Sequence, residues 1–208
     1  DRVAARVRES AELTLLVNNA GFGTLGSLAT APAEQQERMI RLHVLTPMRL
    51  TQAALPGLLE RRRGAVVLVL SHAAGNAMRA RGRGAIVNVS SVASFIYSPG
   101  NVNYCATKAY LTSFSEGLAT ELRGTGVQVQ ALCPGFTRTE FHERMDVGRD
   151  SAPAFLWLDA DDLVRTALAD HDRGKVFSVP GAQYKAVAAV SRLVPPLVLQ
   201  TFQGLGRR

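Results

Sequence analysis

Asn103-Tyr-Cys-Ala-Thr-Lys108 is the stretch that decides how this chain folds and what chemistry it can carry. Tyr104 and Lys108 are four residues apart, so a helix places both side chains on one face. A phenol with its ordinary pKa of about 10 is a poor acid or base at neutral pH. An ammonium group one turn away favours the phenolate and is expected to lower that pKa. The spacing therefore predicts a tyrosine that works as a general acid and base.

A serine precedes this pair at the end of an apolar run. The run Gly84-Ala-Ile-Val-Asn-Val-Ser-Ser91 is typical of a buried parallel strand, and Ser91 is its last residue. A hydroxyl group at the carboxyl end of such a strand is well placed to contact a ligand. Ser91 is therefore a second candidate catalytic residue.

Two further motifs follow apolar runs of the same kind. Asn18-Asn19-Ala20-Gly21 comes after residues 13–17, and Pro134-Gly135-Phe-Thr137-Arg-Thr139 comes after residues 127–133. With Ser91 and the Tyr104/Lys108 pair, these motifs make the chain resemble the short-chain dehydrogenase/reductase superfamily over nearly its whole length.

The resemblance implies an α/β fold in three layers, with a Rossmann-like, mostly parallel sheet between helices on both faces. The length predicts a single domain over residues 1–208. The pattern of residues 183–208 predicts a helical tail that buries against the sheet, a second subunit or, as the least favoured alternative, a membrane surface. The resemblance further implies an oxidoreductase that transfers a hydride between the nicotinamide of NAD or NADP and a small-molecule carbonyl or alcohol. Bulky side chains in the expected substrate-covering segment indicate an apolar substrate, although core packing explains most of them equally well. They are Phe136, Phe141, Met145, Phe155, Leu156 and Trp157.

The resemblance also assigns roles to individual residues. Tyr104 exchanges a proton with the substrate oxygen, Ser91 orients and polarises that oxygen, and Lys108 shifts the pKa of the tyrosine and holds the ribose of the nicotinamide. Besides Tyr104 and Lys108, the residues expected to contact the cofactor are those of the two loop motifs. They are Asn18, Asn19, Ala20, Gly21, Pro134, Gly135, Thr137 and Thr139.

A long helix is predicted from Ala33 to about Arg62, with Thr30 as its N-cap and a kink at Pro47. His43 lies one turn before this proline, where the superfamily usually carries an asparagine that supports a proton path to the lysine. A histidine can relay protons through its two ring nitrogens, so His43 is a candidate catalytic residue. A histidine that simply satisfies its hydrogen bonds within the kink is an equally good interpretation.

The segment Gly21-Phe-Gly23-Thr-Leu-Gly26 fits the G-x-G-x-x-G pattern of dinucleotide-binding turns. We reject that interpretation, because no helix follows at once and no strand ending in an acidic residue follows about 20 positions later. In the superfamily the phosphate turn belongs to a first βαβαβ half, which we expect to be missing here. The 208-residue chain is then expected to bind NAD or NADP weakly. The alternative function is a catalytically silent scaffold, or a truncated product, that acts, if at all, through subunit interaction.

The chain also contains an internal repeat. Gly64-Ala-Val-Val-Leu-Val-Leu-Ser71 aligns with residues 84–91 at an offset of 20, and an arginine-rich segment precedes each copy. Two copies cannot make a repeat array, so we predict a local duplication of the strand that ends at Ser91. Only the second copy has the superfamily spacing to Tyr104.

Composition limits the classes of partner and compartment. The formal net charge is +7, but the arginine clusters, such as 61–63 and 79–83, lack the interleaved aromatic residues of nucleic-acid surfaces. We therefore expect no nucleic-acid partner. No apolar stretch approaches about 20 residues, so we expect no membrane association. Cys105 and Cys133 are too few for a disulfide framework and lack metal-ligand spacing, which favours a reducing cytoplasm and no metal. The resemblance implies a homo-oligomer.

Overall fold

The computed structural model of the chain describes residues 2–10, 13, 16–24, 26–61, 84–139 and 152–193. Within these ranges the chain forms a four-stranded sheet in which every neighbouring pair is parallel and the strands lie in chain order. Parallel neighbours need long crossover connections, and the described connections carry helices. The strands are β1 (Val17–Asn18), β2 (Gly84–Val89), β3 (Val127–Leu132) and β4 (Phe177–Ser178).

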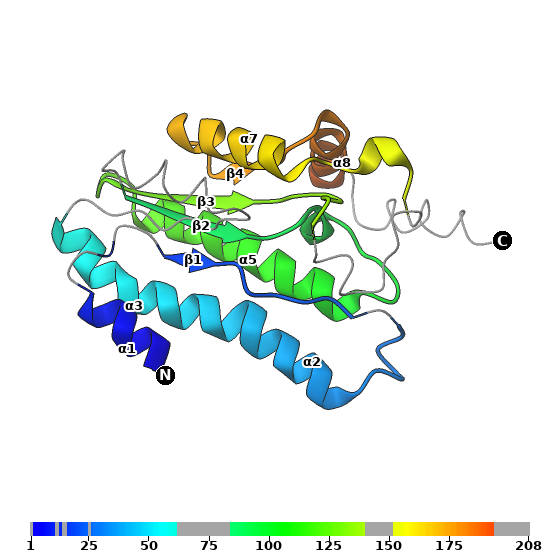
Figure 1. Ribbon diagram of the computed structural model, residues 1–208, viewed down its shortest axis with the longest axis horizontal. Helices are drawn as coiled ribbons and strands as arrows, with labels where there is room; N and C mark the ends of the chain where they lie inside the picture. The colour runs from blue at the N-terminus through cyan, green and yellow to red at the C-terminus, as the bar shows by residue number, and fades with distance from the viewer. Residues whose placement is uncertain are drawn as a thin grey trace.

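Helices cover both faces of this sheet (Figure 1). The helices α3 and α5 lie on one side, and α7 lies on the other, which confirms the predicted three-layer α/β architecture. The helical elements are α1 (Arg2–Glu9), α2 (Ala33–Ile40), η1 (Arg41–Leu45), α3 (Thr46–Arg61), η2 (Val92–Phe95), α5 (Val102–Glu121), η4 (Ala154–Leu156), α7 (Ala160–Asp172) and α8 (Ala182–Leu193).

Strand β2 shows why its sequence is a continuous apolar run. Successive residues of a strand point to opposite faces of the sheet, and both faces are covered here. Ile86 packs in one cluster with Leu58 of α3 and Leu118 of α5. Its neighbour Val87 packs in a second cluster with Leu163 of α7. All five side chains are buried, so the sheet is the centre of the core.

Several predicted helix ends are confirmed. The carboxylate of Asp159 accepts hydrogen bonds from the backbone N–H groups of Asp161 and Asp162, at 2.9 and 3.2 Å, and so caps α7 as predicted. Gly174 follows this helix with a φ of 71°, and Gly124 follows α5 with a φ of 82°. Both values lie in the left-handed region that favours glycine, so these two residues end their helices.

The predicted start of the first long helix at Ala33 is confirmed, but its predicted N-cap is wrong. Thr30 is not the N-cap, because its N–H and hydroxyl groups both donate to the carbonyl of Ser27 in a preceding turn. The helix α2 begins instead after Pro32, which occupies the N-cap position without a side-chain bond. The carbonyl of Pro32 accepts the N–H groups of Gln35 and Gln36, at 3.1 and 3.2 Å.

The break near Pro47 takes a form that the sequence did not predict. Residues Arg41–Leu45 form one π-helical turn, and the N–H of Thr46 donates to the carbonyl of Arg41, five residues back. Proline has no N–H to bond the carbonyl four residues earlier, so the ladder is already incomplete at this point. A single π turn is a common solution, and His43 lies within it.

Some predictions fall outside the described residues. These are the first copy of the repeat at 64–71, the side chains of Phe141 and Met145, and the part of the tail beyond Leu193. The predicted strand at 13–17 is described only as Val17–Asn18. Within the described ranges, no helix has both the length and the apolar character needed to cross a membrane.

Candidate active site

Ser91, Tyr104 and Lys108 come together at the carboxyl end of β2. Ser91 follows the strand and caps η2, where its hydroxyl accepts the N–H of Ala93 at 3.1 Å. Tyr104 lies in the first turn of α5, and its phenol is hydrogen-bonded to the side chain of Ser91. The Nζ atom of Lys108, one turn further on, lies 5.6 Å from the centre of the Tyr104 ring. The helical spacing of the pair is therefore as predicted.

The prediction that Lys108 lowers the pKa of Tyr104 is wrong for this structure. Burial raises the pKa of Tyr104 to about 12, and the hydrogen bond from Ser91 opposes this only in part. Burial also lowers the pKa of Lys108 to about 8. Removal from water is thus the largest cause of the pKa shift of each group. At neutral pH the phenol carries its proton and the lysine is still mainly cationic, so the tyrosine is a proton donor.

Lys108 is held by the end of strand β2. Its ammonium group donates to the carbonyl of Val89 at 2.9 Å, and its side chain is buried. Its own carbonyl accepts the hydroxyl of Ser90 at 2.7 Å, and that hydroxyl also lies 2.6 Å from the hydroxyl of Thr112. These bonds fix the first turns of α5 to the strand that carries Ser91.

The candidate cofactor-binding residues in the loop after β1 differ in their burial. The side chain of Asn18 is buried, and its Nδ2 atom lies 3.3 Å from Oδ1 of Asn88 and 3.5 Å from the hydroxyl of Thr51. Asn19 and Ala20 are exposed on the surface. The structure therefore gives Asn18 a role inside the sheet, whereas the next two residues remain accessible to a ligand.

His43 is buried beside this loop and beside Tyr104. Its Nε2 atom accepts the N–H of Phe22 at 3.0 Å, so the proton of the neutral ring is on Nδ1. Nδ1 then donates to the hydroxyl of Thr107 at 3.1 Å, which in turn donates to the carbonyl of Tyr104. Burial and the charge of Lys108 lower the pKa of His43 to about 3. Both ring nitrogens are occupied, which favours the interpretation of a satisfied histidine over that of a proton relay.

The loop after β3 is tied to the catalytic turn. The carbonyl of Pro134 lies 3.4 Å from the hydroxyl of Ser91. The side chain of Thr137 is buried, and its hydroxyl donates to the carbonyl of Gly135 at 3.0 Å, so it is turned into the loop itself. Thr139 is partly exposed. Of the two threonines, the structure leaves only the second accessible.

Sequence analysis missed Tyr184, which packs against the same loop. Its hydroxyl accepts the N–H of Phe136 at 3.0 Å and donates to the carbonyl of Leu156 at 2.6 Å. The ring of Phe136 lies 5.4 Å from that of Trp157, whereas Phe155 is 72% exposed and covers nothing within the described residues. A contact between residues 48 apart leaves no signal in local spacing.

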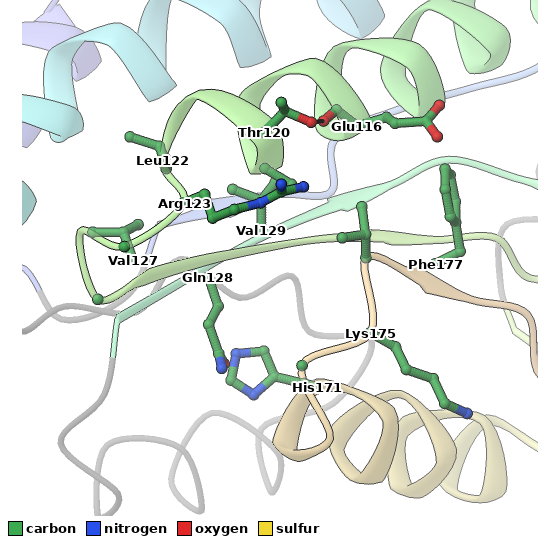
Figure 2. Close-up of a pocket in the computed structure, with 15 residues that line it drawn as sticks. Glu116, Thr120, Leu122, Arg123, Val127, Gln128, Val129, His171, Lys175 and Phe177 are labelled. Atoms are coloured by element: carbon green, nitrogen blue, oxygen red, sulfur yellow. Dashed lines mark hydrogen bonds between the residues drawn. The ribbon is translucent and has the colours of Figure 1, made fainter.

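An open hollow of about 910 Å³ lies at the opposite end of the sheet. It is lined by the end of α5, the first residues of β3 and the segment after α7 (Figure 2). Figure 2 shows Arg123 and His171 on opposite sides of the strand, so the two side chains do not converge on one point. Sheets of this kind bind ligands at the carboxyl ends of their strands, which places the candidate active site elsewhere.

Comparison with known proteins relates this site to characterised chains. The chain is 34% identical over 151 residues to an inactive 2-(S)-hydroxypropyl-CoM dehydrogenase of Xanthobacter autotrophicus, covering 73% of this chain and 57% of that protein. A short-chain dehydrogenase of Sphingobium yanoikuyae, solved with NADPH, superposes with a TM-score of 0.73 at 31% identity, covering 92% and 68% of the two chains. A bulky-bulky ketone specific alcohol dehydrogenase of Comamonas testosteroni gives a TM-score of 0.68 at 28% identity, covering 92% and 66%.

The chain spans about half the length of the curated relatives it matches. A family model described as short chain dehydrogenase matches it twice, over residues 1–79 and over residues 71–149. The two matches meet between the two copies of the repeat, at 64–71 and 84–91. Together they cover well over half of the chain and include all the candidate site residues. The chain therefore belongs to the short-chain dehydrogenase family.

Proposed function

We propose that the protein is an NAD(P)-dependent oxidoreductase that interconverts a carbonyl compound and an alcohol. The observation that carries this proposal is the arrangement at the end of β2. There the phenol of Tyr104 is bonded to Ser91, and the ammonium group of Lys108 lies 5.6 Å from the phenol ring. The family membership and the NADPH bound by the Sphingobium relative support it.

The residues present fit the nicotinamide end of such a cofactor. A phenol and an ammonium group stand at the carboxyl edge of the sheet as donors for ribose hydroxyls, and Asn19 and Ala20 are exposed on the neighbouring loop. When bound, the cofactor supplies or accepts the hydride. Among the described residues, the first helix after β1 begins only at Ala33, so none starts at the strand end to hold a pyrophosphate. We therefore expect weak cofactor binding by these 208 residues.

The side chains divide the proton chemistry between them. Tyr104 is protonated at neutral pH and donates its proton to the substrate oxygen as the carbonyl is reduced. Ser91 holds the same oxygen through its hydroxyl, which already lies beside the phenol. The cationic Lys108 stabilises the phenolate that remains, because the two groups share a site removed from water. In the direction of oxidation, Tyr104 takes the proton back.

An apolar ketone or secondary alcohol is the substrate class that the surroundings support. The paired rings of Phe136 and Trp157 and the partly buried Leu156 give the segments beside the site an apolar character. The relative from Comamonas testosteroni is named for bulky ketones, and its fold is shared over 92% of this chain.

Replacement of the tyrosine tests this function. Tyr104→Phe removes only the phenolic proton, so reduction of a panel of aryl and alkyl ketones with NADH or NADPH should fall at least about a hundredfold. Tyr110→Phe is the matched control, because Tyr110 lies on the same helix and stacks on Phe114 away from the site. Turnover that survives in Tyr104→Phe would refute the assignment. A wild-type chain that reduces none of the ketones would favour the silent scaffold.

A further inference from the structure

Tyr184 stands on α8 and lies against the loop that follows β3. Its side chain is 5% exposed, and its ring covers Gly135 so closely that a Cβ atom there would come 2.0 Å from the ring carbon Cζ. The φ of Gly135 is not in the left-handed region, so the ring and not the backbone requires glycine at this position. The loop and the helix are therefore in direct contact at a position where no other side chain fits.

The hydroxyl of Tyr184 joins two further segments. It accepts the N–H of Phe136 and donates to the carbonyl of Leu156, so both of its hydrogen-bonding functions are used. The same two segments are bonded to each other, because the N–H of Leu158 donates to the carbonyl of Phe136 at 2.8 Å and the N–H of Arg138 donates to the carbonyl of Leu158 at 3.0 Å. The hydroxyl of Tyr184 adds a further connection between the two segments, next to the first bond of this ladder.

The ladder borders the catalytic turn. Pro134, which directly precedes the residues held by Tyr184, offers its carbonyl to the hydroxyl of Ser91 and to the N–H of Val92, at 3.4 and 2.9 Å. A shift of Gly135 would move this carbonyl, and with it an acceptor of the serine hydroxyl. The position of Ser91 is thus linked to α8 through two residues of the loop.

We propose that Tyr184 is a positioning residue, which fixes the Pro134–Thr139 loop to the segment 154–158 so that the two sides of the site move as one unit. The inference rests on the proposed function for its catalytic meaning, but the mechanical link stands on the contacts alone. Tyr184 touches neither the substrate nor the reacting atoms. It acts through Pro134 on Ser91, and through Leu156 on the apolar segment beside the site.

Hydrogen exchange of the backbone tests the link in the full 208-residue chain. Tyr184→Phe keeps the ring over Gly135 and removes the acceptor of the Phe136 N–H, so exchange at Phe136 should become roughly tenfold faster. Amides of β2 and β3 should keep their wild-type rates. Tyr110→Phe is again the control, because the described residues provide no hydrogen bond for its hydroxyl. Unchanged exchange at Phe136, or a rise shared equally by both strands, would overturn the proposal.

Kinetics test the positioning role. For a ketone that the wild type reduces, Tyr184→Phe should lower kcat about tenfold, while the pH profile of kcat keeps its position because Tyr104 is untouched. The effect should be smaller in a Ser91→Ala background, since the link ends at that serine. Equal effects in both backgrounds would overturn the role. If the wild type reduces no ketone, the proposed function fails, whereas the exchange rates still decide whether Tyr184 holds the loop.

Discussion

Two Gly-Phe turns flank the candidate active site, and they are held in the same way by different side chains. Gly21-Phe22 follows β1, and Gly135-Phe136 follows β3. In both turns the phenylalanine N–H donates over 3.0 Å to a buried side chain from a distant part of the chain. The acceptor is Nε2 of His43 in the first turn and the hydroxyl of Tyr184 in the second. In both, the ring packs over the glycine: an added Cβ atom would come 2.9 Å from Nε2 of His43 in the first turn and 2.0 Å from Cζ of Tyr184 in the second.

The two turns differ in what the ring holds at its other end. His43 donates to Thr107 and so ties the first turn to the helix that carries Tyr104. Tyr184 donates to Leu156 and ties the second turn to the segment beside the substrate. The same arrangement thus fixes the first turn to the helix that carries the proton donor Tyr104. It fixes the second turn to the segment that is expected to line the substrate site.

The two turns should differ most in how much stability is lost when the glycine of each is replaced by alanine. Gly135→Ala places a methyl group 2.0 Å from the Tyr184 ring, and we expect it to lower the free energy of unfolding by about 3 kcal/mol or more. Gly21→Ala meets only Nε2 of His43, at 2.9 Å, and should cost about 1 kcal/mol. Urea unfolding of both variants measures the difference.

A glycine within a helix provides the control for a Gly→Ala substitution without a steric clash. Gly117 lies in α5 with nothing within 4 Å of the added Cβ atom, so Gly117→Ala should stabilise by about 1 kcal/mol. If Gly21→Ala and Gly135→Ala lower the free energy of unfolding equally, the two rings pack equally closely on their glycines, and the comparison is wrong.

Lys108 lies between the two turns and should lower the stability of the fold at neutral pH. Its pKa is lowered from 10.5 to about 8, so the unfolded chain takes up the proton first as the pH falls. As the pH falls from 10.5 to 8, the wild type should lose stability and Lys108→Met should not. The stability of the variant relative to wild type should therefore rise by up to roughly 3 kcal/mol over this range and stay level below pH 8. Unfolding measured across that range checks this. A difference independent of pH would show that the ammonium group is not desolvated.

His43 should make the first turn sensitive to acid, whereas the second turn has no such group. The pKa of His43 falls from 6.5 to about 3 on folding, so stability is lost as the pH drops through this window. The loss is about 1.4 kcal/mol for each pH unit below 6.5. His43→Asn should remove this slope while ketone reduction at pH 7 is retained. If the slope persists in the variant, another group is responsible for it.

The smallest effect on stability is expected when the first copy of the repeat is deleted. Among the described residues, the hydrogen bonds that hold the two turns come from His43 and Tyr184, which both lie outside this copy. Deletion of residues 64–83 joins Arg63 to Gly84 and should leave the melting temperature unchanged or slightly higher. A variant that melts well below the parent would show that the first copy is integral to the core.

Sequence alone predicted what depends on local pattern. The apolar runs located β2 and β3, and the spacings located Ser91, Tyr104 and Lys108. The raised pKa of Tyr104 was not predicted, because it depends on how the packed chain removes the phenol from water. The π turn around His43 and the contact of Tyr184 also depend on tertiary neighbours. The homo-oligomer stays a prediction from the resemblance, and the cytoplasmic location stays a prediction from the cysteines.

The buried amide of Asn18 has a consequence for how the strands find their places during folding. Among the described residues, Val17 and Asn18 of β1 pair with β2, and so short a pairing specifies its own alignment poorly. Asn18 bonds Asn88 directly opposite, and Asn88 donates in turn to the hydroxyl of Ser115. A slip by one residue would leave these amides without partners in an apolar interior, at a cost of about 1–3 kcal/mol each. The polar chain thus favours the native register of β1 on β2 over a register shifted by one residue.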